Sequence, residues 1–138
     1  WLNAQLVNSG SPYVTAEDQA LVSALKPGWH LDAINSERAK ETLMRLCLHY
    51  LVAEKRGKLP LDPVARFHLG NGARVEQLNW LGDISANGIS QSYGMLANYG
   101  YKLNHVEENH EAFVNQNVIA QSKAIAAQLK APTVTKIS

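Results

Sequence analysis

The sequence predicts a mixed α/β or α+β fold in which helices flank a sheet. Three observations support this fold class. Two segments in the N-terminal half repeat apolar residues at helical spacing, a central segment around Asn71-Gly72 has the signature of a β-hairpin, and helical spacing returns in the C-terminal third. The 138 residues fit one domain better than two. With 46% hydrophobic and 18% charged residues, the chain has enough apolar side chains for a core.

The N-terminal half contains two predicted helices after an initial loop. Residues 1–14 include turn-forming residues and show no clear period, so we expect a loop there. Thr15 and Asp18 match a capping box, which predicts that a helix begins beside Thr15. A second helix is predicted to begin near Asn35 and to bury one face. The residues of that face are Ala39, Leu43, Leu46, Cys47, Tyr50 and Leu51.

The central segment is predicted to form a β-hairpin. Asp62-Pro63 indicates a turn, and the β-branched and aromatic residues of 64–69 then favour a strand. Asn71-Gly72 fits the two central positions of a type I′ turn, because both positions need positive φ. A second strand is predicted to return from Ala73 to Trp80. This register places three side chains on one face of the hairpin, those of Val64, Arg66 and His68.

The C-terminal third is predicted to contain two helices and a short strand. Apolar residues at helical spacing indicate a helix within residues 85–98, although its two glycines weaken an isolated helix by about 1 kcal/mol each. The alternating pattern of residues 99–103 favours a strand. A last helix is expected from near Glu108 to Lys130. We therefore expect residues 15–131 to fold and residues 132–138 to form a tail.

Composition and charge argue against several function classes. The 13 basic and 12 acidic residues give a formal charge of +1, which lacks the basic excess of a nucleic-acid-binding module. No segment has the roughly 20 apolar residues of a membrane span, and no basic leader precedes an apolar stretch, so we expect a cytoplasmic protein. The single cysteine, Cys47, excludes an internal disulfide framework and is predicted to be a small core residue. The first residue is Trp1 rather than methionine, so we expect the chain to be part of a longer protein.

Candidate chemistry centres on the histidines, because the sequence lacks the common phosphate-loop, dinucleotide-binding, zinc-protease and nucleophile-elbow motifs. His105 and His110 flank two glutamates, but their spacing does not put them on one face of a helix. We therefore favour a solvated loop or helix start over a metal site there. His68 precedes the predicted turn, where a hairpin would fix its direction and leave it accessible. From spacing alone, His68 is either a packed residue or a reactive one.

Three motifs around His68 resemble those of a known enzyme family. Residues 63–73 have the pattern Pro-Val-Ala-x-Phe-His-Leu-x-Asn-Gly-Ala, and residues 79–85 have the pattern Asn-Trp-x-x-Asp-x-Ser. Residues 95–101 begin with methionine and end in Asn-Tyr-x-Tyr. Together these motifs resemble the C-terminal part of the malonyl-CoA decarboxylases, with close agreement from about Leu46 to Leu103.

The resemblance implies a fold, a reaction and a set of partners. The chain would be the C-terminal portion of a catalytic domain with a mixed sheet and an acetyltransferase-like (GNAT-type) fold. The family converts malonyl-CoA to acetyl-CoA and carbon dioxide without a metal or an organic cofactor, and its helical N-terminal domain is involved in oligomerisation. We therefore expect malonyl-CoA or a related CoA thioester as the substrate, no cofactor, and a homo-oligomer. Neither nucleic acid nor a membrane is expected as a partner.

The resemblance also implies roles for three residues. His68 falls on the family's catalytic histidine, the proton donor, and would also contact the substrate. Such a donor is needed because the thioester carbonyl accepts the electrons of the broken bond as an enolate, after which the carbon takes up a proton. Tyr101 matches a family tyrosine and is a second catalytic candidate, since its hydroxyl would orient His68 or the substrate. The equally supported alternative is that Tyr101 is an aromatic core residue. Asn71 would shape the turn or contact the substrate.

The family's upstream catalytic serine has no counterpart in this chain, so two alternatives stay open. One is a catalytically inactive CoA-binding or subunit-packing fragment. The other is a relative of the acyl-CoA acyltransferases, which would need a second acceptor substrate. Release of carbon dioxide without an added acceptor separates decarboxylation from acyl transfer.

Overall fold

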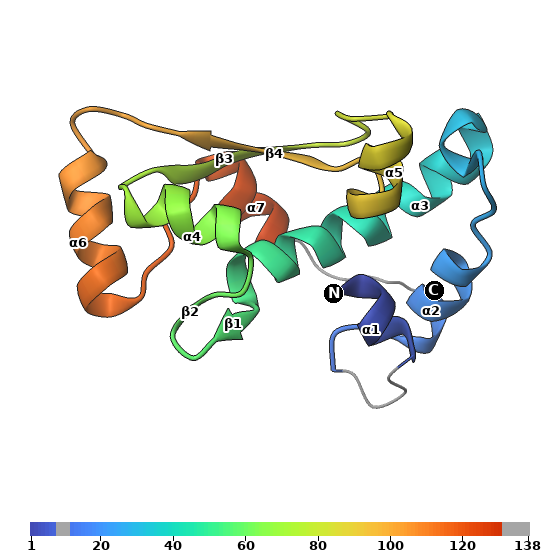
Figure 1. Cartoon of the computed structure of the whole chain (residues 1–138), viewed down its shortest axis with the longest axis horizontal. Coiled ribbons are helices and arrows are strands. Elements are labelled where there is room, and N and C mark those ends of the chain that lie inside the picture. Colours follow the sequence, from blue (N-terminus) through green and yellow to red (C-terminus); the bar gives the residue numbers. More distant parts are fainter. Residues whose placement is uncertain (8–11, 131–138) are drawn as a thin grey trace. The chain divides into compact units, whose positions relative to one another are not determined.

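The computed structural model describes residues 1–7 and 12–130, which form two compact units. Unit 1 comprises Trp1–Tyr50 and Asn79–Leu96, and unit 2 comprises Leu51–Leu78 and the described part of Ala97–Ser138. Figure 1 labels the helices and strands of both units. Among the helices of the described ranges, none has the length and apolar character needed to cross a membrane.

The first part of unit 1 is helical from its beginning. Its elements are α1 (Leu2–Val7), α2 (Ala16–Ser23), the 3-10 helix η1 (Trp29–Leu31) and α3 (Ala33–Leu48), after which the chain forms the π-helical turn η2 (His49–Ala53). Helix α1 shows that the loop expected over residues 1–14 is wrong for its first half. The helix is too short to display a period, and the side-chain amide of Gln19 on α2 donates a hydrogen bond to the Leu6 carbonyl. The expected tail at 132–138 lies outside the described residues.

The capping box at the start of α2 is confirmed. The Thr15 hydroxyl accepts a hydrogen bond from the Asp18 N–H at 3.0 Å, and the Asp18 carboxylate accepts one from the Thr15 N–H at 3.0 Å. Asp18 is buried, and its carboxylate also forms an ion pair with Arg45 of α3 at 2.6 Å. One carboxylate therefore both caps the start of α2 and attaches this helix to α3.

Helix α3 supplies the core of unit 1, as its apolar period predicts. It begins two positions earlier than predicted, because Asp32 caps it by accepting hydrogen bonds from the N–H groups of Ile34 and Asn35 at 2.9 and 3.1 Å. Most residues of the predicted apolar face are buried, which confirms this face, whereas Cys47 and Tyr50 are only half-buried. The buried members on α3 are Ala39, Leu43 and Leu46, and Leu48 joins them. Leu51 is also buried, but it lies in η2 and belongs to unit 2.

The helix predicted within residues 85–98 is shorter in the structure. Helix α5 spans Ala86–Ser92, and the Ser85 hydroxyl caps it by accepting a hydrogen bond from the Gly88 N–H at 3.0 Å. It ends at Tyr93, whose φ of +53° is left-handed, and Gly94 follows with a φ of +79°. Two successive residues with positive φ cannot continue a right-handed helix, so the chain turns here before the next strand.

Unit 2 overturns the predicted hairpin, because residues 63–70 form a helix rather than a strand. Helix α4 spans Pro63–Gly70, and the Asp62 carboxylate caps it by accepting a hydrogen bond from the Ala65 N–H at 2.9 Å. Proline is well suited to the first helical position, where no N–H is needed. Ala65 and Leu69 are buried, one turn apart. The predicted shared face of Val64, Arg66 and His68 is therefore wrong.

The turn after α4 is also not of type I′. Asn71 has a φ of −93°, and only Gly72, with a φ of +90°, uses the left-handed region. The turn instead ends a helix, since the Gly72 N–H donates to the Leu69 carbonyl at 3.1 Å. Strand β3 (Arg74–Asn79) follows, so a strand at the predicted position of Ala73 to Trp80 is confirmed, although it follows a helix and is not the second strand of a hairpin.

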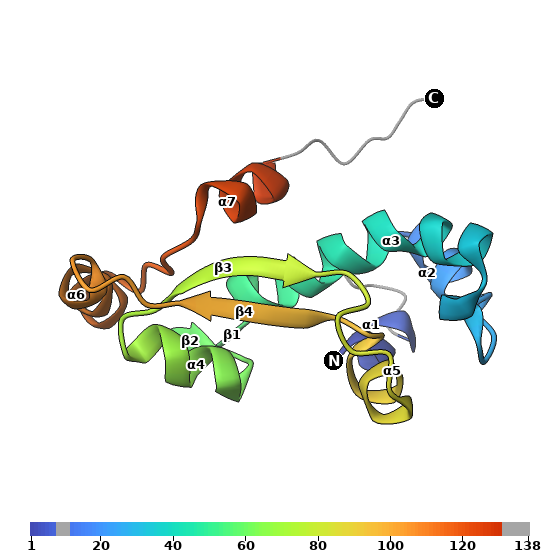
Figure 2. The same ribbon diagram turned by 90° about the horizontal axis from the view of Figure 1, so that it is seen from above.

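Strand β3 lies between two neighbours. It pairs with β4 (Leu96–Gly100), and the two strands run in opposite directions in Figure 2. On its other edge, Val75 forms an isolated parallel bridge with Gln121. The short strands β1 (Lys55–Arg56) and β2 (Leu59–Pro60) pair antiparallel as a second small sheet. Strand β4 lies earlier than the predicted 99–103, so it contains Tyr99 but ends just before Tyr101.

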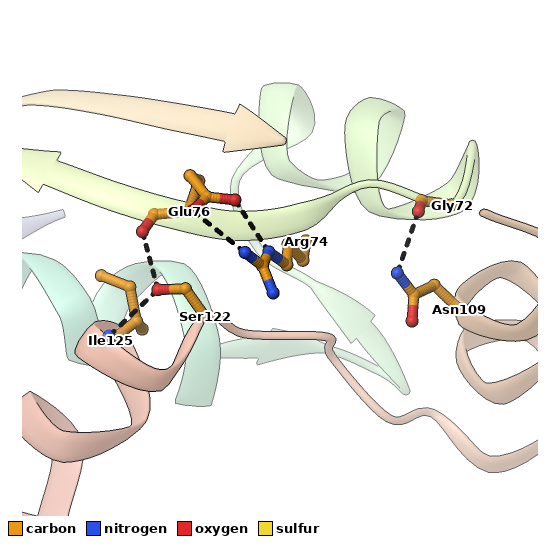
Figure 3. A network of polar contacts seen from close by, with 6 residues as sticks. All are labelled: Gly72, Arg74, Glu76, Asn109, Ser122 and Ile125. Atoms are coloured by element: carbon orange, nitrogen blue, oxygen red, sulfur yellow. Dashed lines mark hydrogen bonds and ion pairs between the residues drawn. The ribbon is translucent and has the colours of Figure 1, made fainter. Parts of the chain in front are cut away.

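The predicted last helix is two helices in the structure. Helix α6 spans Val106–Gln116 and ends at Asn117, whose φ is +57°, and α7 spans Lys123–Lys130. Ser122 explains the second start, because its buried hydroxyl accepts a hydrogen bond from the Ile125 N–H at 3.2 Å. The same hydroxyl donates to the Glu76 carbonyl at 2.7 Å, which attaches the beginning of α7 to β3 (Figure 3).

Candidate active site

His68 lies in the last turn of α4 and is half-buried. The backbone around it is closed by hydrogen bonds, since its carbonyl accepts from the N–H groups of Asn71 and Ala73, both at 3.1 Å. Its position in unit 2 is therefore set by the end of a capped helix rather than by a hairpin. The sequence placed His68 next to the correct turn but on the wrong element.

Tyr99 of β4 and Tyr101, which follows this strand, contact the imidazole of His68. The Tyr101 hydroxyl lies 2.7 Å from Nδ1 of His68. The ring of Tyr99 stacks on the imidazole, with the ring centroids 4.7 Å apart and the planes inclined by 17°. The stacking restrains the plane of the ring, and the hydroxyl restrains its rotation within that plane. Nε2 is the ring nitrogen on the far side from Tyr101.

A third aromatic ring borders His68. Phe67 meets the imidazole edge-on, with the centroids 5.2 Å apart and the planes at 81°. Its side chain is 65% exposed and that of Tyr101 is 47% exposed. The imidazole therefore lies among apolar ring surfaces at an accessible position of unit 2. Such a group is chemically suited to hold a proton at one nitrogen and to transfer it to a bound substrate.

The structure brings together two of the three residues singled out by the sequence, His68 and Tyr101. Asn71 is exposed and is the C-terminal cap residue of α4. Its backbone N–H donates a hydrogen bond to the His68 carbonyl. Its contact with a substrate stays a prediction. Sequence reasoning missed Tyr99 as a contact of His68. Period two places residues 99 and 101 on the same side of an extended chain, so the motif itself carried that signal.

The other candidate histidines lie near the site without forming a metal centre. His105 is the exposed residue before α6, and His110 lies on α6 with Nδ1 at 2.6 Å from the Gly70 carbonyl oxygen. Over residues 1–7 and 12–130, no three or more histidine, cysteine, aspartate or glutamate side chains are grouped to hold a metal ion. His110 instead donates a hydrogen bond to the end of the helix that carries His68.

Strand β3 of unit 2 carries a charged pair, Arg74 and Glu76. Arg74 Nε lies 2.7 Å from Glu76 Oε1, and Arg74 Nη2 donates to Glu76 Oε2 at 3.1 Å (Figure 3). The hydrogen bonds from Arg74 hold the pKa of Glu76 below its ordinary value, and Lys102 acts in the same direction. The same bond raises the pKa of Arg74. Glu76 is thus stabilised as a carboxylate.

Comparison with known proteins gives one consistent match. The family model described as the malonyl-CoA decarboxylase C-terminal domain matches residues 1–138. The mitochondrial malonyl-CoA decarboxylase of Anser anser anser is 45% identical over 83 residues, which cover 60% of this chain and 16% of the relative. The mitochondrial malonyl-CoA decarboxylase of Rattus norvegicus is 41% identical over 83 residues, which cover 60% of this chain and 17% of the relative.

Solved structures agree with the sequence match. The malonyl-CoA decarboxylase from Rhodopseudomonas palustris superposes with a TM-score of 0.88 at 42% identity, covering 93% of this chain and 30% of that protein. The malonyl-CoA decarboxylase from Agrobacterium vitis gives a TM-score of 0.87 at 38% identity, covering 95% of this chain and 33% of that protein. The chain therefore spans only a minor part of the relatives that it matches.

Proposed function

The chain belongs to the malonyl-CoA decarboxylase family, and we propose that the full-length protein containing it converts malonyl-CoA to acetyl-CoA and carbon dioxide. The enzyme would be a carboxy-lyase whose substrate is a CoA thioester. The observation that carries the proposal for this chain is the contact of the Tyr101 hydroxyl with Nδ1 of His68 at 2.7 Å, because it orients a proton-transferring ring.

The proposed reaction divides into bond cleavage and protonation. Cleavage of the bond between the carboxylate carbon and the α-carbon releases carbon dioxide and leaves the electron pair on the α-carbon. The thioester carbonyl delocalises that pair as an enolate, so the substrate provides its own electron sink and no metal or organic cofactor is proposed. One proton delivered to the α-carbon then gives the acetyl group.

His68 is the proposed proton donor, and Tyr101 is the proposed positioning residue. When the ring is protonated on both nitrogens, Nδ1–H donates to the Tyr101 oxygen and Nε2–H faces away from the tyrosine. Delivery of the Nε2 proton then leaves a neutral imidazole that keeps its proton on Nδ1. Stacking on Tyr99 would hold the Nε2–H bond in a constant direction while negative charge moves from the substrate carboxylate to the enolate. The proposal therefore assigns the transferred proton to Nε2 of His68.

Replacement of His68 in the full-length protein tests this role. His68→Asn keeps a polar side chain but removes the titratable ring, so we expect decarboxylation to fall by about 10²-fold or more without loss of folding. The matched control is His105→Asn, at an exposed histidine outside the ring cluster. Carbon dioxide release is measured with no acyl acceptor present, and melting temperature is measured on the same preparation. Near-normal turnover of folded His68→Asn would refute the role of His68, and a requirement for an acceptor would indicate an acyltransferase instead.

Three finer properties are proposed from the family resemblance. They are an acetyltransferase-like (GNAT-type) fold of the complete catalytic domain, a homo-oligomer assembled through a helical N-terminal domain, and a cytoplasmic location. Light scattering of the full-length protein tests the oligomer, and fractionation of the source cells tests the location. A direct substrate contact by Asn71 is tested by Asn71→Ala, which should raise KM if the side chain binds malonyl-CoA.

A further inference from the structure

The carbonyl groups at the end of α4 have partners from two sources. A helix leaves its last carbonyls without partners inside the helix. The carbonyls of His68 and Leu69 are taken by N–H groups of the following turn. The Gly70 carbonyl is instead bound by the side chain of His110, whose Nδ1 lies 2.6 Å away and must be the donor. The end of the helix that carries His68 is therefore completed by α6.

The next residue of α6 toward the N-terminus binds the same turn. Asn109 donates a hydrogen bond from Nδ2 to the Gly72 carbonyl at 3.2 Å, as Figure 3 shows. Consecutive side chains of α6 thus hold two carbonyls that lie on either side of Asn71. Both contacts fall within residues 70–72, immediately after the proposed proton donor.

The backbone of α6 is in close contact with this turn. A Cβ atom at Gly72 would lie 2.3 Å from the carbonyl oxygen of Val106, the first residue of α6. At Gly70 a Cβ would lie 3.8 Å from Cε1 of the buried Phe113. The turn has no space to shift toward α6, and the two side-chain hydrogen bonds oppose a shift away from it.

The same segment of chain also carries Tyr101. The Lys102 carbonyl accepts hydrogen bonds from the N–H groups of His105 and Val106 at 2.8 and 3.0 Å, so a single closed turn connects Tyr101 to α6. Residues 101–110 therefore contact His68 through its ring and also hold the helix end from which the ring projects. A movement of α6 would change both restraints together.

We infer that Asn109 and His110 are positioning residues for the proton transfer, which they serve by fixing the turn after His68. The inference rests on the proposed function, since it assumes that His68 delivers a proton. Reacting atoms must meet at short range, and a displacement of about 1 Å costs up to about 10²-fold in rate. Loss of both hydrogen bonds should therefore lower kcat more than it raises KM.

The test uses the full-length enzyme with malonyl-CoA. In Asn109→Ala/His110→Ala we expect kcat to fall by about 10- to 100-fold with KM changed by less than about threefold. His110→Asn keeps an N–H donor at the position of Nδ1 and should recover most of the activity that His110→Ala loses. Asn115→Ala, at an exposed asparagine of the same helix, is the matched control and should behave as the wild type.

A second measurement does not depend on activity. Diethyl pyrocarbonate modifies accessible imidazole nitrogens, and mass spectrometry follows its rate at His68. We expect faster modification of His68 in the double variant and an unchanged rate in Asn115→Ala. The inference is overturned if kcat and the His68 rate match the control, or if His110→Asn is as damaging as His110→Ala. If the wild type releases no carbon dioxide, the proposed function fails instead, and the modification rates still decide whether α6 positions His68.

Discussion

The Tyr101 hydroxyl lies 2.7 Å from Nδ1 of His68, a residue 33 positions earlier in the chain. The two side chains come from different elements of unit 2, one from the end of α4 and the other from the segment after β4. Because the hydroxyl occupies one ring nitrogen, it determines which nitrogen remains for chemistry. The contact makes the orientation of His68 depend on the path of the chain between β4 and α6.

Tyr101→Phe removes this hydroxyl and retains the ring. We expect kcat for malonyl-CoA to fall by about fivefold, since one hydrogen bond that orients the imidazole is worth roughly 1 kcal/mol. KM should change little. Tyr13→Phe removes a phenolic hydroxyl from the other unit and should leave kcat unaltered. Equal kcat values for the two variants would show that Tyr101 does not orient His68.

Gly72→Val should be far more damaging than Gly57→Val. Both glycines have positive φ, +90° at Gly72 and +68° at Gly57, so both substitutions cost backbone strain. Only at Gly72 would the new Cβ meet backbone, the Val106 carbonyl oxygen at 2.3 Å, whereas nothing lies within 4 Å at Gly57. Urea unfolding should place Gly72→Val about 1–3 kcal/mol below Gly57→Val. Equal stabilities would contradict the close packing of α6 against the turn.

Asp62→Ala tests the start of α4. Losing the bond from the Ala65 N–H to the Asp62 carboxylate should lower the free energy of unfolding by about 1 kcal/mol. Asp62→Asn keeps an acceptor oxygen at the cap and should retain most of the stability. Chemical denaturation measures both variants, and an equal loss of stability in Asp62→Ala and Asp62→Asn would contradict the cap.

The Arg74–Glu76 pair predicts a pH-dependent contribution to stability. The pKa of Glu76 is lowered in the folded protein, chiefly by hydrogen bonds from Arg74, so folding favours the carboxylate. That contribution is present above the ordinary pKa of 4.5 and is lost as the pH falls through the lower folded value. Glu76→Gln should therefore melt below the wild type at pH 7, with the difference disappearing in acid. Glu111→Gln, on the surface of α6, serves as the control, and a difference that persists at low pH would exclude this linkage.

Sequence patterns predicted the elements whose signals are local. The Thr15 and Asp18 capping box and the buried face of α3 are both confirmed, because each depends on residues within a few positions of one another. Helix α4 was missed because Asp62-Pro63 suits a turn as well as a capped helix start. Eight residues are too few to show a helical period, and the burial of Ala65 and Leu69 within unit 2 decides the outcome.

The sequence predicted only part of the site, because the rest depends on contacts between residues that are distant in the chain. The motifs identified His68 and Tyr101, but their contact depends on how α4 and β4 are arranged in unit 2. Period two could have added Tyr99. Nothing in the sequence marked Asn109 or His110 as a contact of the turn after α4, since their partners are backbone carbonyls that any residue type supplies.

The parallel bridge beside β3 has a consequence for how the protein is made. Val75 donates its N–H to the Ala120 carbonyl at 2.8 Å and accepts the Ser122 N–H at 2.9 Å, so its partners leave the ribosome only after the whole of β4 and α6. Until then the nascent chain exposes one open edge of β3, the kind of edge through which growing polypeptides associate. Contacts this distant in sequence also slow folding, because a long loop must close before the bridge forms. The 120–122 segment thus makes completion of β3 one of the last steps in the biosynthesis of this region.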